Sequence, residues 1–216
     1  MVITIEGIKK DIPSCYEQLT TRQYELLIPE LAKDIVDRDH FKMFQVLANT
    51  SFQEFHATSE NEVTIWNAIK WLYEQHFEFG EMPKVLRIVE CDKDRIVRIP
   101  KDVTKLSIGQ NVRLKQIIAE SKYLEENLSA AVAVYLQPLF DEAKFEDDRA
   151  MEFKETIEQM PVYLIRPIGF FLLTHASGSG GRQVSLWRRT LNNLGQSLSA
   201  MSQLWQRSQG YNLSRT

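Results

Sequence analysis

The side chains that most readily bind a metal ion or attack a substrate are scattered along this sequence. Four histidines and two cysteines carry such chemistry: His40, His56, His76, His175, Cys15 and Cys91. None of the histidines stands in an H-E-x-x-H pattern or at a zinc-ligand spacing from a cysteine. The cysteines form no C-x-x-C pair and have no expected base beside them. We therefore expect no metal site and no cysteine nucleophile, and the two cysteines favour a reducing, cytoplasmic compartment.

Two further segments have the composition of ligand-binding loops but lack the residues that such loops need. Segment 177–181, Ser-Gly-Ser-Gly-Gly, is followed by Arg182 and Gln183, where a phosphate-binding P-loop needs lysine and a hydroxyl residue. The acidic segment 141–148 lacks the central glycine of a calcium-binding loop, and we expect it to be a solvated turn. Because no G-x-S-x-G pattern occurs either, the sequence predicts a protein that is not an enzyme and uses no cofactor.

Charge is divided unevenly along a chain of otherwise ordinary composition. The 216 residues are 44% hydrophobic and 25% charged, which is typical of a globular protein with one large or two small domains. The net charge is −3, but the last acidic residue is Glu158, so residues 1–158 carry −9 and residues 159–216 carry +6. Such a chain can pair with a second copy of itself or present its basic end to an acidic partner.

Neither a nucleic acid nor a membrane is the partner that we expect. The basic end places arginines among Trp187, Trp205 and Tyr211, which can stack on bases, but six charges over 58 residues are few and the acidic remainder repels a polyanion. The sequence opens without the pattern of a signal peptide, and its longest apolar run, 168–173, is far shorter than the roughly 20 residues of a membrane span. We expect a soluble protein that is not exported.

Two β-hairpins are predicted, each ending in an Ile-Pro pair. Residues 2–6 are predicted to form a strand, after which a short return segment ends at Ile12-Pro13. Residues 85–89 are predicted to form another strand, and the return strand over residues 95–99 ends at Pro100. Each Ile-Pro is followed at the same spacing by a leucine and a capping box, Thr20-x-x-Gln23 in one case and Ser107-x-x-Gln110 in the other. The matched residues share an offset of 87, which predicts an internal duplication.

The duplication defines the expected fold class and domain organisation. We expect an α+β fold that is predominantly helical, with a first hairpin-plus-helices repeat over 1–83 and a second over 84–176. The almost wholly apolar segment 162–173, which follows a Pro161 suited to a helix N1 position, is expected to be a buried central helix. The pattern leaves open whether the two hairpins join into one small sheet or the halves stay separate.

A C-terminal helix is predicted beyond a glycine- and serine-rich linker over 177–183. Over 184–216, apolar residues recur at spacings of four and three, which is the seam of a heptad repeat. We assign partner binding to these residues: Trp187, Leu191, Leu194, Leu198, Met201 and Trp205. The seam suits a contact with a helix of another chain or with the protein's own body. Its tryptophans and arginines also suit an interfacial membrane helix, although its polar face is rich in amides and only modestly basic.

The motif Ile12-Pro13 followed by Leu19-Thr20-x-x-Gln23-Tyr24 resembles the opening of small tail-assembly and tail-chaperone-like proteins of tailed bacteriophages, especially those that infect Bacteroidetes. The second half is similar to the same proteins in Ile99-Pro100, in segment 106–110 and in the helix over 161–173, so the resemblance covers about residues 1–175. It implies a non-enzymatic protein that coats the hydrophobic helices of the tape-measure protein until the tail tube grows around them.

The sequence thus predicts a phage assembly protein. The first hypothesis is a tail assembly chaperone that binds tape-measure helices. The alternative is a structural virion component, such as a connector, tail or baseplate protein, whose C-terminal helix docks in an oligomer. The expected partner is the tape-measure protein or another tail protein, with a homo-oligomer as a further possibility. The expected location is the host cytoplasm, or the virion under the alternative.

Overall fold

The structure is a computed structural model that describes residues 1–5, 8–51, 62–74, 81–91, 93–100 and 105–176. Over these residues the chain is mostly helical and contains two small antiparallel sheets, in agreement with the expected fold class. The predicted linker over 177–183 and the predicted C-terminal helix over 184–216 lie outside the described residues. None of the described helices is both long and apolar enough to cross a membrane.

The first half begins with a hairpin and continues with helices. The strands β1 and β2 pair in an antiparallel register that places Val2 opposite Asp11, as predicted. The described elements of this half are β1 (Val2–Ile5), β2 (Ile8–Asp11), η1 (Tyr16–Gln18), α1 (Thr21–Leu31), η2 (Ile35–Asp37), α2 (His40–Ala48), α4 (Glu62–Ile69) and α5 (Trp71–Glu74).

The second half follows the same order with a longer hairpin and longer helices. Its strands pair with Val85 opposite Arg98, which confirms the second predicted hairpin. The described elements are β3 (Val85–Glu90), β4 (Lys93–Arg98), α6 (Ile108–Glu120), η4 (Leu124–Asn127), α7 (Leu128–Asp141), α8 (Asp147–Gln159) and α9 (Val162–Ala176). The two hairpins form separate two-stranded sheets within the described residues, so they do not join into one sheet there.

Both predicted capping boxes are confirmed. The backbone N–H of Gln23 donates to the Thr20 hydroxyl oxygen over 3.2 Å, and the Thr20 N–H donates back to the Gln23 side chain over 3.1 Å. Ser107 and Gln110 exchange the same two bonds, at 3.2 and 3.0 Å. Two otherwise unpaired N–H groups are thereby satisfied at each helix start, so α1 begins at Thr21 and α6 at Ile108.

The glutamine of each capping box also reaches the next long helix of its half. The Gln23 amide donates to the carbonyl of Leu47 in α2 over 3.2 Å, and the Gln110 amide donates to the carbonyl of Val134 in α7 over 2.9 Å. Leu47 and Val134 are themselves 87 residues apart, the offset of the two glutamines. The two boxes therefore start their helices and also dock them in the same way.

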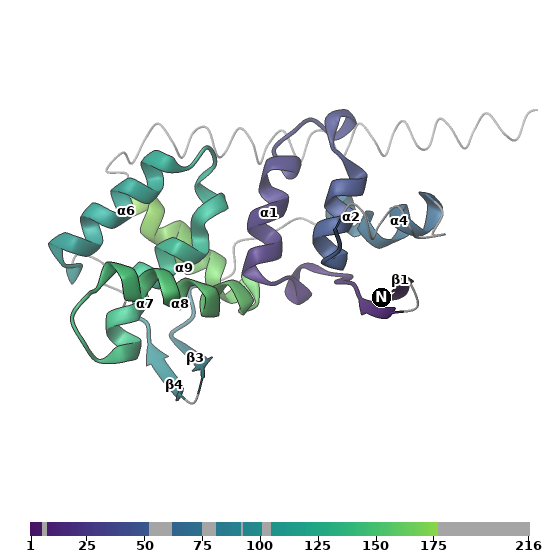
Figure 1. Ribbon diagram of the computed structural model, residues 1–216. Helices are drawn as coiled ribbons and strands as arrows, with labels where there is room; N and C mark the ends of the chain where they lie inside the picture. The colour runs from purple at the N-terminus through teal and green to yellow at the C-terminus, as the bar shows by residue number, and fades with distance from the viewer. Residues whose placement is uncertain (6–7, 52–61, 75–80, 92, 101–104, 177–216) are drawn as a thin grey trace, which may run out of the picture.

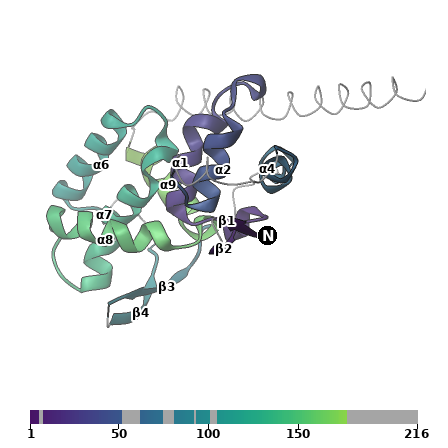
Figure 2. The ribbon, with the colours of Figure 1, turned by 45° about the vertical axis from the view of Figure 1, so that its right-hand side comes forward.

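The interior joins the two halves, and α1 lies between α2 and the helices of the second half in both views (Figures 1 and 2). One buried cluster contains residues of α1, α2 and α4 together with residues of α6, α7 and α9. A second cluster lies under the β3–β4 hairpin, against α7, α8 and α9. The two halves thus share part of one hydrophobic core.

Helix α9 occupies the central position predicted for segment 162–173. It packs against η1 and α1 of the first half and against α6, α7 and η4 of the second. Its approach to α7 is close, since a Cβ on Gly169 would lie 2.7 Å from a side-chain carbon of Leu128. Most of the helix is buried as predicted, but Tyr163 and Phe171 are exposed. Pro161 lies just before the helix rather than at its first position.

The α8–α9 joint holds the start of α1. The Thr21 N–H donates to the carbonyl of Met160 over 2.8 Å, and the Val162 N–H donates to the carbonyl of Leu19 over 2.9 Å. The Thr21 hydroxyl also donates to the Met160 carbonyl, over 2.9 Å. These bonds satisfy backbone groups at the starts of α1 and α9 across more than a hundred residues of sequence.

Candidate functional site

The residues to which partner binding was assigned lie outside the described residues. This holds for the whole seam, namely Trp187, Leu191, Leu194, Leu198, Met201 and Trp205. Which of these side chains come together therefore stays a prediction. The described part of the chain offers two kinds of candidate site: clusters of charged and hydroxyl side chains, and apolar side chains that face outward.

The side chains with metal-binding or nucleophilic chemistry do not assemble in the described part of the chain. The His40 ring lies tilted against Trp66 and edge-to-face with Tyr73, with ring centroids 5.4 and 5.7 Å away. The other three histidine side chains lie outside what the structure describes. Cys15 and Cys91 are free thiols, and among the described residues no three His, Cys, Asp or Glu side chains are grouped to hold a metal ion.

A buried polar cluster links the halves through four side chains: Tyr16 of η1, Tyr24 of α1, Glu125 of η4 and Arg166 of α9. Glu125 and Arg166 are each 2% exposed. The Arg166 Nε donates to Glu125 over 2.9 Å, and the Tyr24 hydroxyl donates to the other Glu125 oxygen over 2.5 Å. The Arg166 guanidinium also lies over both tyrosine rings, 5.4 Å from the centroid of Tyr24 and 5.9 Å from that of Tyr16.

The pKa shifts in this cluster keep Arg166 and the two tyrosines protonated at neutral pH. Burial lowers the pKa of Arg166, but the nearby Tyr24 and Glu125 raise it by more, so the guanidinium stays charged. Burial and the charge of Glu125 raise the pKa of Tyr24 well above its ordinary value, and burial raises the pKa of Tyr16 to about 12. The hydroxyl of Tyr24 therefore remains a donor at neutral pH, and the cluster acts as a fixed connector between η1, α1, η4 and α9.

Glu25 makes a second polar link between the halves. Its carboxylate accepts the backbone N–H of Ser129 over 2.6 Å and the Ser129 hydroxyl over 2.9 Å, at the start of α7. A negative charge at a helix N-terminus is favourable, but burial here raises the pKa of Glu25 to about 7, against the opposing effect of the Ser129 bonds. Glu25 therefore changes its charge near neutral pH.

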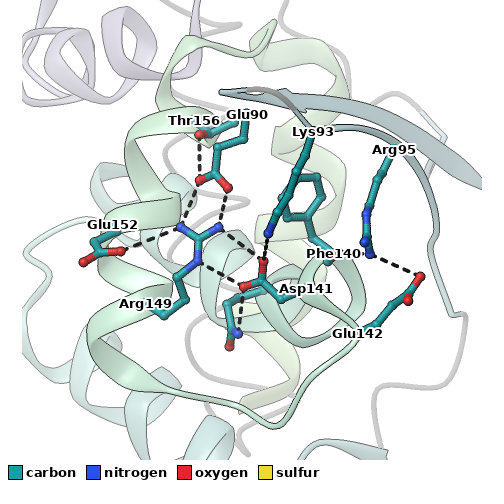
Figure 3. Close-up of polar contacts among 10 residues, drawn as sticks. Glu90, Lys93, Arg95, Phe140, Asp141, Glu142, Arg149, Glu152 and Thr156 are labelled. Atoms are coloured by element: carbon teal, nitrogen blue, oxygen red, sulfur yellow. Dashed lines mark hydrogen bonds and ion pairs between the residues drawn. The ribbon is translucent and has the colours of Figure 1, made fainter.

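A third cluster, around Arg149 of α8, fixes the second hairpin (Figure 3). Arg149 forms ion pairs with Glu90 at the end of β3 and, over 3.1 Å, with Asp141 at the end of α7. Lys93 of β4 lies 3.5 Å from Asp141, and Thr156 donates to Glu90 over 3.3 Å. Burial alone would raise the pKa of Asp141, but its bonds to Gln137 and Arg149 lower it below the usual range.

Two conclusions follow from the geometry of this third cluster. The expectation that segment 141–148 is a solvated turn is wrong for Asp141, which is largely buried and accepts bonds from α7 and α8. The carboxylates of Glu90 and Asp141 are both paired with Arg149, so the cluster is a rigid anchor for the hairpin.

The anchored hairpin turns an apolar face outward. Its inner face buries Leu86, Ile88 and Val97, while its outer face carries the exposed aliphatic side chains of Val85, Val89 and Ile96. Arg87 and Asp94 form an ion pair across that outer face, with one N–O distance of 2.9 Å. Exposed aliphatic residues on a sheet face are typical of surfaces that contact another chain.

Comparison with known proteins gives no further assignment. Neither a protein family, nor a curated protein sequence, nor a solved structure matches the chain. The site must therefore be interpreted from its own residues.

Sequence reasoning did not find the buried clusters, although one signal was present. Arg166 is the lone charged residue in the apolar segment 162–173. A charged side chain in a helix expected to be buried requires an ionised partner. That partner, Glu125, stands 41 residues earlier in the chain, and nothing local in the sequence distinguishes it from its neighbour Glu126.

Proposed function

We propose that residues 1–83 and 84–176 are two copies of one hairpin-plus-helices repeat. Both halves run in the order hairpin, capping-box helix, short 3-10 helix, second helix. In both, the capping-box glutamine donates to a carbonyl 24 residues later. The N–H of Ile12 and that of Ile99 each donate to the carbonyl of the residue that precedes the hairpin, over 2.6 and 3.0 Å. The pairs Gln23/Gln110, Leu47/Val134 and Ile12/Ile99 share the offset of 87, which supports descent from one unit.

We further propose that the protein is a non-enzymatic phage assembly protein, namely a tail assembly chaperone that binds tape-measure helices. The observation that carries this proposal is the C-terminal heptad seam, set in a segment, 184–216, with four arginines and no acidic residue and joined by a glycine- and serine-rich linker. The polar clusters that tie the halves together support the role of the body as a stable scaffold for that segment. The protein acts in the host cytoplasm, before the tail tube encloses its partner.

The proposed mechanism is the temporary burial of an apolar helical stripe. Tape-measure helices expose apolar side chains until the tube surrounds them, and covering such area contributes roughly 25 cal/mol per Å². The seam from Trp187 to Trp205 offers a matching stripe, and the outward-facing aliphatic residues of the β3–β4 hairpin offer further apolar area. Large aromatic side chains at the two ends of the seam are suited to anchor such a contact.

The test is co-expression of the full chain with a helical fragment of a phage tape-measure protein. We expect the wild type to keep the fragment in the soluble fraction and to co-purify with it. The double variant Leu191→Asp with Leu198→Asp is expected to lose this retention, because it places two charges on the seam. The matched control, Asn192→Asp with Gln196→Asp, adds the same charge off the seam and should retain the fragment. Equal retention by both variants would overturn the proposal.

A structural virion component is the second candidate. The observation that favours it is the division of charge between residues 1–158 and 159–216, which suits permanent pairing between copies of the chain. In that case the C-terminal helix docks in an oligomer that stays in the particle. Quantifying the protein in purified virions separates the two candidates, since a stoichiometric amount favours the structural component and absence favours the chaperone.

A further inference from the structure

The two capping-box helices carry corresponding stripes of residues on one face. Positions one, five, eight and twelve of a helix lie on the same side. On α1 and its C-terminal cap these positions are Thr21, Glu25, Ile28 and Ala32, and on α6 they are Ile108, Val112, Lys115 and Ala119. Each pair is related by the offset of 87. We refer to these sets as the α1 stripe and the α6 stripe.

The α1 stripe is covered by the second half of the same chain. Thr21 is fully buried and bonds to Met160 at the α8–α9 joint. Glu25 is buried against Ser129 at the start of α7, and Ile28 is buried in the core cluster that joins the halves. The elements of the second half that contact α1 are η4, α7, α8 and α9, and the stripe itself bonds to the α8–α9 joint and to the start of α7.

The α6 stripe is open. Ile108 is 85% exposed and Val112 is 50% exposed, although both are large aliphatic residues. Lys115 and Ala119 complete the stripe and are also exposed. Two apolar residues in an exposed line on a helix, at positions that are buried in the corresponding helix, indicate a face from which a covering surface is missing.

A surface that corresponds to the cover of the α1 stripe is exposed on the first half. In the second half that cover includes η4 and the start of α7, and at the offset of 87 their counterparts are η2 and the start of α2. Val36 corresponds to Tyr123, which packs against the core, yet Val36 is 90% exposed. Asp34 and Asp37 beside it are exposed as well.

Charge is complementary between these two open surfaces. The surface at η2 and the start of α2 carries the exposed acids Asp34, Asp37 and Asp39. Its exposed lysines, Lys33 and Lys42, are both paired with the buried Glu30. The α6 stripe carries Lys115 and is preceded by the exposed Lys105. Opposite charges at the rim of an apolar contact set its register and speed association. The two surfaces lie on different halves, so one molecule presents both and a second copy supplies the missing cover for each.

We propose that copies of this chain associate head to tail, with the α6 stripe of one copy against η2 and the start of α2 of the next. The contact repeats, between molecules, the way in which the second half covers the α1 stripe within the molecule. This inference rests on the repeat proposed above but not on the identity of any phage partner. Because the two faces differ, the association is heterologous and extends to a ring or a filament.

Sedimentation velocity of the full chain over a concentration series tests this contact. The variants Ile108→Asp and Val36→Asp each remove one face, and Ile96→Asp is the matched control because Ile96 is 72% exposed on the outer face of the hairpin. We expect the wild type and the control to self-associate alike, and each face variant to raise the dissociation constant at least roughly tenfold. Thermal unfolding of each variant verifies that the fold is retained.

Mixing the two face variants gives the sharpest result. Ile108→Asp keeps the η2 face and Val36→Asp keeps the α6 stripe, so the mixture should form a one-to-one dimer that cannot extend. A symmetric contact, in which one face binds itself, does not predict this dimer. A second pair of variants, Lys115→Asp and Asp37→Lys, should likewise weaken association singly and restore it when both changes are made in one chain.

Three results would overturn the inference. The first is a wild type that stays monomeric at every concentration. The second is face variants that associate as strongly as Ile96→Asp. The third is association that Leu194→Asp abolishes while Ile108→Asp and Val36→Asp leave it intact, which would assign it to the C-terminal seam. Retention of a tape-measure fragment is measured separately, so failure of that function leaves the mixed dimer as an independent result.

Discussion

Helices α1 and α6 start in the same way and end in different surroundings. Both follow an Ile-Pro and a capping box, and both are docked by the glutamine of that box. Yet α1 buries Thr21, Glu25 and Tyr24 against the second half, while α6 exposes Ile108 and Val112. A local motif therefore determines where each helix begins, whereas its burial depends on which distant element covers it.

The largest expected effect comes from breaking the cluster that covers α1 and has no counterpart on α6. Arg166→Met leaves Glu125 buried without a cation, and removing one partner of a buried ion pair costs about 3–5 kcal/mol of unfolding free energy. Urea-induced unfolding followed by circular dichroism measures this loss. On the α6 side, Asn111→Ala at the position equivalent to Tyr24 should change stability by less than about 1 kcal/mol, since its bonds are to nearby carbonyls of its own helix start.

The second effect is a pH dependence confined to the α1 stripe. Burial raises the pKa of Glu25 from 4.5 to about 7, so between those values the folded protein binds a proton that the unfolded chain releases. Stability should therefore fall as pH rises from about 4.5 to 7 and stay lower above that range. Glu25→Gln removes this dependence and should stabilise the protein at pH 8 by up to about 3 kcal/mol, with little change at pH 5.

The control for this pH effect is the equivalent position on α6. Val112→Glu introduces a carboxylate at a site that is half exposed and solvated. Thermal unfolding of this variant should show no added pH dependence between pH 5 and 8. A pH profile for Glu25→Gln that matches the wild type would show that Glu25 is not the titrating group.

The third effect should be equal on the two helices. Thr20→Ala and Ser107→Ala each remove a cap whose oxygen accepts an N–H over 3.2 Å. Loss of such a cap typically costs about 1 kcal/mol, and we expect the two losses to agree within about 0.5 kcal/mol. Chemical denaturation of both variants tests this, and a clearly larger loss for Thr20→Ala would indicate that the cap also supports the α8–α9 joint.

The smallest effect on folding is expected on the open stripe. Ile108→Asp should change the unfolding free energy of the monomer by no more than about 0.5 kcal/mol, because the side chain is almost fully exposed. Thr21→Val, its counterpart on α1, removes a hydroxyl bond to Met160 and should cost about 1 kcal/mol. Unfolding curves measured at a concentration where the protein is monomeric compare the two directly.

Much of the fold could be predicted from the sequence because its signals are local. The hairpins are marked by β-branched residues and turn residues, and the capping boxes by a hydroxyl residue and a glutamine three positions apart. The burial of α9 followed from its apolar composition, although the exposure of Tyr163 and Phe171 did not. The longer hairpin and longer helices of the second half were not predicted, since the matched residues lie only around each Ile-Pro and box.

The polar clusters could not be predicted, because their members are far apart in the chain. Glu25 meets Ser129 across 104 residues, and Glu90 meets Arg149 across 59. Asp141 is an example of what a local pattern cannot predict. Its acidic neighbours in the sequence suggested a solvated turn, whereas in the fold it forms ion pairs with Arg149 and Lys93. The sign of a pKa shift or the solvation of a carboxylate depends on neighbours that a local pattern does not contain.

The starts of α1 and α6, each after an Ile-Pro and a capping box at an offset of 87, can be found from the amino-acid sequence alone. The two helix starts rest on hydrogen bonds between residues three positions apart, so a local pattern is enough to predict them. The burial of the α1 stripe and the exposure of the α6 stripe become visible in the folded chain. Burial is a property of two surfaces that meet. Among the described residues, elements of the second half contact α1, whereas Ile108 and Val112 of the α6 stripe are exposed.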